Sequence, residues 1–240
     1  MTKLYTLLLA AIVHLGFLPA NAQKTITDPN VVTRAIKDEI IGVVVSSAID
    51  VYLSQGSQTA VAVSASDYRY VDNIHTEVLD NILYITYKNA GNVGWGPKIL
   101  RAYVSAPVFS LIKASGACNV MVDGQLKSND LEISMGGSSD FRGSVEVQNL
   151  KILCSGSSDV RIAGSAVNLK ATVSGSSDIK GFDLAVDYCD LEASGASDIQ
   201  ITANKELKVK ASGASDVHYR GAATVREISA SGAAGVKRKS

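Results

Sequence analysis

The 240-residue sequence contains few of the residues that interrupt β pairing or carry common catalytic chemistry. It has 4 prolines, 3 histidines and 3 cysteines, and aromatic residues make up only 6%. Few prolines permit long paired strands, because proline lacks the N–H that a β ladder requires. The 23 basic residues balance the 23 acidic ones, so the sequence lacks the basic surplus typical of nucleic-acid-binding proteins. No nucleic-acid partner is therefore expected.

Beyond the N-terminal segment, no apolar run reaches the ~18 residues that a transmembrane helix needs. The N-terminal segment itself has the three parts of a secretory signal peptide. These are a positive charge at Lys3, an apolar stretch over 4–18 and a small-x-small cleavage site at 20–22. Residues 1–22 are predicted to be removed, which leaves a mature chain that starts near Gln23. The protein is expected to be exported and soluble, in the periplasm, at the cell surface or outside the cell.

What the sequence does contain is one phrase that occurs seven times. A clear copy is Ser155-Gly156-Ser157-Ser158-Asp159-Val160, and the glycine of the phrase recurs every 18 to 21 residues. The seven glycines are Gly116, Gly137, Gly156, Gly175, Gly195, Gly213 and Gly232. A fixed period of this length indicates a solenoid, in which each repeat buries its apolar face only against its neighbours.

Apolar and polar residues alternate ahead of each glycine. Before Gly156 the apolar positions are Cys154, Ile152 and Leu150, with polar residues such as Lys151 between them. A period of two is typical of strands with one buried face, and no segment shows helical periodicity long enough to cover a sheet. We therefore predict an all-β chain that forms a single-stranded parallel β-helix with rungs of ~19 residues, stacked about 4.8 Å apart.

The segments before the regular repeats also read as strands and turns. Strands are expected at 41–45, 48–53, 60–65, 74–78, 82–87 and 99–104, with turns at 28–30, 55–57 and 79–81. Residues 23–38 are predicted to be a polar lead-in, residues 39–236 the β-helix domain with regular repeats from about residue 110, and residues 237–240 a basic C-terminal tail. A charged end suits a strand edge that must not pair with another molecule.

Three cysteines are an odd number for an exported protein. Cys154 and Cys189 fall on inward-facing positions, and Cys118 takes the place of a serine of the repeat. Buried thiols that act as small apolar side chains are expected. One disulfide is the alternative.

The aspartate of the phrase is the main candidate for chemistry. Five carboxylates are expected to align, one on each rung: Asp140, Asp159, Asp178, Asp198 and Asp216. We favour a structural role, in which each aspartate accepts a hydrogen bond from the backbone N–H two residues on and so closes the corner. Basic residues two positions after the aspartate, such as Arg161 and Lys180, would screen the repulsion within the column.

Two chemical roles of this column remain open. A row of Ca²⁺ sites is one, because carboxylates are calcium ligands, although the nine-residue period of the calcium-binding rolls is missing. Hydrolysis of glycans by neighbouring carboxylates is the other, but five equivalent aspartates lack the separated pKa values that an acid and a base need. No catalytic residue, cofactor or metal is therefore assigned, and an enzyme is not expected. Trp95, in the Gly-rich stretch 89–97, is either a platform for a sugar ring or, as we favour, an apolar lid.

The order of these segments resembles that of a known bacterial family, the auto-transporter adhesins with a head GIN domain. The resemblance rests on the strand pair at 48–56, on the Thr-Glu-Val…Leu-Tyr-Ile segment at 76–85 and on the repeated phrases, and it covers residues from about 38 to 236. It implies a right-handed β-helix in an exported protein of Bacteroidetes-like bacteria and supplies no functional residues. The implied function is an adhesin or cell-envelope binding module for an extracellular glycan or protein surface. A purely structural envelope protein is the alternative.

Overall fold

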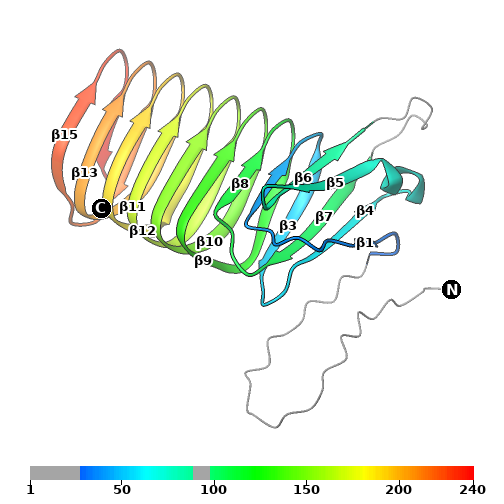
Figure 1. Cartoon of the computed structure of the whole chain (residues 1–240). Coiled ribbons are helices and arrows are strands. Elements are labelled where there is room, and N and C mark those ends of the chain that lie inside the picture. Colours follow the sequence, from blue (N-terminus) through cyan, green and yellow to red (C-terminus); the bar gives the residue numbers. More distant parts are fainter. Residues whose placement is uncertain (1–27, 89–97) are drawn as a thin grey trace, which may run out of the picture.

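The computed structural model describes residues 28–88 and 98–240 (Figure 1). The predicted signal peptide and Trp95 lie outside the described residues. Within them, strands make up nearly all of the regular structure, and one short 3₁₀ helix, η1 (Tyr68–Asn73), is the exception. In this part of the chain no helix is both long and apolar enough to cross a membrane.

Five long strands form the body of the molecule (Figure 1). They are β9 (Asn119–Met135), β10 (Asp140–Cys154), β11 (Asp159–Val173), β12 (Asp178–Ala193) and β13 (Asp198–Ala211). Each strand runs from one Ser-Gly corner to the next and pairs in parallel with the strand one repeat away, so that Leu150 lies beside Leu169. The fold is thus the predicted β-solenoid, with about 7 turns and ~19-residue rungs. Gly164 lies within β11, where the register against β12 shifts.

The apolar columns predicted from the alternation fill the interior. The column four residues before the motif glycine is buried from Ile112 to Val209, and the column after the aspartate is buried from Val120 to Val217. Burial of each large aliphatic side chain contributes roughly 1.5–3 kcal/mol. Lys151, Lys170 and Lys210, which stand between apolar positions, are exposed. The repeated phrase therefore serves first to align these columns.

Each corner requires a glycine for two reasons. The backbone is left-handed there, with φ of +82° at Gly156 and +79° at Gly175, a region that disfavours side chains. A Cβ on Gly175 would also lie 2.5 Å from the carbonyl oxygen of Gly156, one rung away. That oxygen accepts the N–H of Ser176 at 2.8 Å, so the corner cannot open without loss of a bond between rungs.

The first rungs are not stacked in sequence order. β2 (Gly42–Val45) and β3 (Ile49–Gln55) form one rung. On one side they pair in parallel with β6 (Ile82–Tyr87) and β7 (Leu100–Ala106), and on the other with β8 (Leu111–Ala114) and β9. The rung formed by β6 and β7 is therefore outermost at the N-terminal end, although it comes later in the sequence. The regular array continues from the rung formed by β2 and β3.

Residues 46–51 form a further corner, which was not predicted from the sequence as a copy of the phrase. Val51 pairs with Val120, and the Asn119 amide donates to Asp50 at 2.7 Å. The aspartate column therefore begins at Asp50. In place of the corner glycine stands Ser47, with a φ of +74°. The copy is hidden because a serine occupies a backbone conformation that usually calls for glycine.

Antiparallel strands finish the stack at its N-terminal end. β4 (Ala60–Ala65) pairs with β7, β1 (Val32–Arg34) with β4, and β5 (Ile74–Leu79) with β6. The predicted turn at 79–81 is confirmed as a tight hairpin, with positive φ at Asp80 and Asn81. The polar segment ahead of β2 is attached to this end: Asp28 accepts hydrogen bonds from Ser64 and, at 3.0 Å, from Arg101.

The C-terminal end has no such cover in the described chain. β14 (Asp216–Arg220) and β16 (Gly235–Arg238) continue one side of the stack, and β15 (Thr224–Ala230) continues the other. All residues of β15 are exposed, and Ile228 is 48% exposed although it belongs to a column that is buried elsewhere. Arg226 forms an ion pair with Glu206 at 2.6 Å, so this edge is charged.

Candidate binding groove

The structure places the five predicted aspartates in one column. Asp140, Asp159, Asp178, Asp198 and Asp216 are partners in the register of successive strands. Two of the carboxylates accept a hydrogen bond from the next rung: Asp140 from the N–H of Asp159 and Asp178 from that of Asp198, each at 3.3 Å. The bond predicted to the N–H two residues on is wrong for this column. Asp140 and Asp178 thus join rungs rather than close corners.

Basic side chains screen the column, as predicted. Arg161 lies 2.9 Å from Asp159, and the Lys180 ammonium bridges Asp159 at 3.1 Å and Asp178 at 3.3 Å. The hydrogen bond from Lys180 to Asp159 raises the pKa of the lysine above its ordinary value. Partly exposed pairs of this kind contribute about 0–1 kcal/mol each. Across the described residues, no three His, Cys, Asp or Glu side chains are grouped so that they could hold a metal ion.

The serine before the aspartate closes the corner. The Ser158 hydroxyl donates to the carbonyl oxygen of Ser155 at 3.0 Å and accepts the N–H of Ser139 at 3.2 Å. Five equivalent serines have no exposed surface: Ser139, Ser158, Ser177, Ser197 and Ser215. Buried hydroxyls require such partners, because an unpaired one costs about 1–3 kcal/mol. The repeated phrase is therefore a stacking device.

The three cysteines are free and buried, which confirms the expectation of core thiols over a disulfide. Cys118 occupies the serine position of its rung, and its thiol donates to the Ser115 carbonyl oxygen at 3.3 Å. Burial raises the pKa of Cys154 to about 11 and that of Cys189 to about 12. Because the thiolate is the reactive form, these groups are suited to packing rather than to chemistry.

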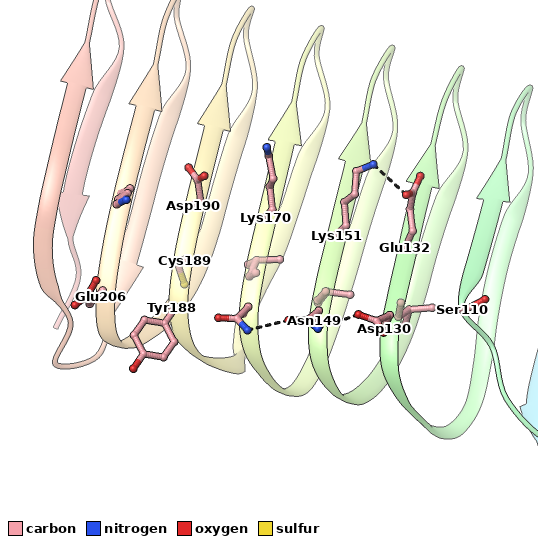
Figure 2. A pocket seen from close by; sticks show the side chains of 15 residues that line it. Ser110, Asp130, Glu132, Asn149, Lys151, Lys170, Tyr188, Cys189, Asp190 and Glu206 are labelled. Atoms are coloured by element: carbon pink, nitrogen blue, oxygen red, sulfur yellow. Dashed lines mark hydrogen bonds and ion pairs between the residues drawn. The ribbon is translucent and has the colours of Figure 1, made fainter.

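A groove of about 710 Å³ crosses the rungs on the face formed by the later parts of the long strands. Two rows of side chains border it (Figure 2). The corner row consists of Asp130, Asn149, Asn168, Tyr188 and Glu206, and the strand row consists of Glu132, Lys151, Lys170, Asp190 and Lys208. Between the rows, residues such as Leu150 and Cys189 are buried. Successive members of a row lie one rung apart, about 4.8 Å, so the groove presents a regular series of polar groups.

Hydrogen bonds order the corner row (Figure 2). The Asn149 amide donates to Asp130 at 2.8 Å, and the Asn168 amide donates to Asn149 at 2.8 Å. Tyr188 takes the next place in register, with 41% of its surface exposed. The Lys205 ammonium lies 5.5 Å from the centre of the Tyr188 ring. An amide ladder thus leads to one exposed aromatic ring.

Charges of both signs line the groove. Lys151 pairs with Glu132 at 3.0 Å, and Arg226 from the last rung pairs with Glu206 at 2.6 Å. The hydrogen bond from Arg226 lowers the pKa of Glu206. Overall the lining carries four carboxylates and three ammonium groups. The charges that line the groove therefore nearly balance.

This groove was not predicted from the sequence. All members of the corner row stand seven residues before a motif glycine, as Asn149 does before Gly156 and Tyr188 before Gly195. The available signal was one large aromatic residue in a column that is otherwise polar. This column varies from rung to rung, whereas the repeated aspartates form the more conspicuous pattern.

Comparison with known proteins adds a family to this geometry. The family described as "Putative auto-transporter adhesin, head GIN domain" matches residues 41–223. The chain belongs to this family. The predicted resemblance is thus confirmed. No curated protein shows significant similarity to the chain.

Solved structures share the fold of this head GIN domain. A protein titled "putative adhesin" from Bacteroides fragilis is 19% identical, with a TM-score of 0.78 over 87% of this chain and 97% of that chain. One titled "putative lipid binding protein" from Parabacteroides distasonis is 21% identical, with a TM-score of 0.64 over 87% and 97%. A third, a "putative adhesin" from Parabacteroides merdae, is 18% identical, with a TM-score of 0.61 over 88% and 96%. At these identities the likeness concerns the fold.

Proposed function

We propose that this protein is exported and acts as a non-enzymatic adhesion module that binds an extracellular glycan or protein surface. The observation that carries the proposal is the groove, which offers ordered polar groups and one exposed aromatic ring over successive rungs. The adhesin label of the family agrees with this use. Three carboxylates of the aspartate column, those of Asp140, Asp159 and Asp178, are engaged by neighbouring rungs or basic side chains, which makes the column a weaker candidate for a site than the groove.

The reasons against catalysis are physical. Neighbouring carboxylates act as acid and base only when their surroundings separate their pKa values. The aspartates of the column occupy one position in the register of successive strands, and burial raises the pKa values of Cys154 and Cys189, which holds these thiols in their protonated form. A rigid stack of paired strands suits the presentation of a surface.

An array of glycans and extracellular matrix proteins tests the proposal. The folded chain is expected to bind at least one class of glycan or matrix protein on the array. The same chain unfolded by heat serves as the control. Absence of binding to every spot would contradict the adhesion role and favour a purely structural envelope protein. Export is tested separately by the mass of the released protein, which is expected to start near Gln23.

A further inference from the structure

We propose that the groove binds an extended, uncharged glycan, with Tyr188 as the platform for one sugar ring. The inference rests on the proposed adhesion function and specifies its ligand class and site. Sugar rings present apolar C–H faces and a rim of hydroxyls that both donate and accept hydrogen bonds. A site for them needs an exposed aromatic face beside polar groups of both kinds.

Tyr188 provides the aromatic face. Its ring projects from β12 at the edge of the groove (Figure 2) and is 41% exposed. In the two preceding rungs the same position holds Asn149 and Asn168, so no feature of the repeat requires an aromatic residue there. Tyrosine offers a large apolar surface with a polar hydroxyl at its tip. Such a side chain suits contact with a ligand that has an apolar face and hydroxyl groups at its rim.

The amide ladder provides donors and acceptors in a fixed order. Each asparagine amide carries two N–H groups and two acceptor lone pairs. The bonds from Asn149 to Asp130 and from Asn168 to Asn149 use one N–H of each donor. The second N–H of each amide is left for a ligand hydroxyl. Because these amides are held by one another, little side-chain freedom would be lost on binding.

The charge of the lining favours an uncharged ligand. Four carboxylates and three ammonium groups face the groove, and the pair of Lys151 with Glu132 neutralises one of each. The carboxylates would repel a polyanion, and the ammonium groups would repel a polycation. Hydroxyl groups can bond to both kinds.

The sheet itself argues against a peptide ligand. One common way for an extended peptide to bind a β protein is to add a strand to an unpaired sheet edge. The groove instead crosses β9 to β13, whose backbone groups already pair with one another. A ligand in the groove would therefore bind to side chains and not to backbone groups. These side chains lie along a line across the rungs, which suits a linear polymer.

Calorimetric titration of the purified chain with uncharged oligosaccharides of increasing length tests the inference. Sulfated oligosaccharides and a vesicle of neutral phospholipid serve as other ligand classes. Affinity is expected to rise with length and to change little with salt. Tyr188→Ala should weaken binding about tenfold, whereas Tyr188→Phe should retain it. The matched control is Tyr84→Ala, because Tyr84 is 38% exposed on β6 and lies outside the groove.

The outcomes separate this inference from the adhesion function. Equal loss in Tyr188→Ala and Tyr84→Ala would overturn the groove as the site. Binding only to proteins, to sulfated sugars or to the vesicle would overturn the ligand class and leave adhesion or another binding role standing. Absence of any binding, here and on the array, would overturn both. Thermal melts of the variants show whether a loss reflects misfolding, and retained binding by Tyr188→Phe then assigns the effect to the ring.

Discussion

The backbone N–H of Ser158 donates to the hydroxyl of Ser177 at 3.1 Å, so the serine of one rung receives a hydrogen bond from the same position one rung before. Ser158 in turn receives the N–H of Ser139 at 3.2 Å. With the bond from the Cys118 N–H to Ser139, these contacts link the corners of four successive rungs, from Cys118 to Ser177. The repetition of Ser-Gly-x-Ser follows from the need to satisfy each buried hydroxyl and N–H at the corners.

The close approach of the corners predicts a difference between two glycines with the same backbone angle. Gly175 and Gly124 have φ of +79° and +80°. A Cβ on Gly124 would meet nothing within 4 Å, whereas one on Gly175 would press on Gly156. Gly124→Ala should cost about 1–2 kcal/mol of backbone strain, and Gly175→Ala about 1–3 kcal/mol more. Urea denaturation measures both, and equal losses would contradict the stacked-corner account.

Isoleucines of one column should differ in their contribution according to their rung. Ile152 is fully buried, whereas Ile228 on the last rung is 48% exposed. Ile152→Ala should cost about 2–5 kcal/mol because it leaves a cavity. Ile228→Ala should cost less than about 1 kcal/mol. The comparison uses free energies of unfolding from denaturant melts. A large cost at Ile228 would show that the last rung is covered in solution.

Asp28 should make stability depend on pH at the N-terminal end. Burial raises the pKa of Asp28, but hydrogen bonds from Ser64, the Asn30 N–H and Arg101 outweigh burial, so the pKa lies below 3.8. A lowered pKa in the folded state stabilises the protein above the unfolded pKa of about 3.9, and this contribution is lost as pH falls through the folded value.

The matching variant is Asp28→Asn. It should lose about 1–3 kcal/mol at pH 7, and the gap between the two proteins should shrink as pH falls below about 4. Unfolding free energies measured between pH 7 and pH 3 provide the test. A gap that stays constant over this range would show that the charge of Asp28 is not what stabilises the native state.

Much of the fold could be predicted from the sequence because the repeat carries its own register. The glycines fix the corners, and the apolar alternation around residues such as Ile152 fixes which face is buried. The first corner escaped prediction because Ser47 stands where the other copies have glycine. The stacking of β6 and β7 outside β2 and β3 also escaped, since only long-range pairing decides it.

The site was harder to predict than the fold. Aspartate and serine can both close a corner, and the prediction assigned this role to the aspartate. The structure decides by distance: the Ser158 hydroxyl lies 3.0 Å from the Ser155 carbonyl oxygen, whereas Asp159 faces Arg161 and Lys180. The groove depends on which side chains meet across rungs, and the exposure of Tyr188 cannot be read from one sequence.

The central claim is that the repeated phrase stacks the chain through its serine, whereas its aspartate is dispensable. Unfolding free energies of the adjacent variants Ser158→Ala and Asp159→Asn test this claim most directly. Ser158→Ala should lose about 1–3 kcal/mol, because buried groups on two rungs lose a partner. Asp159→Asn should lose about 0–1 kcal/mol, since only partly exposed ion pairs are affected. A larger loss in Asp159→Asn than in Ser158→Ala would contradict the account.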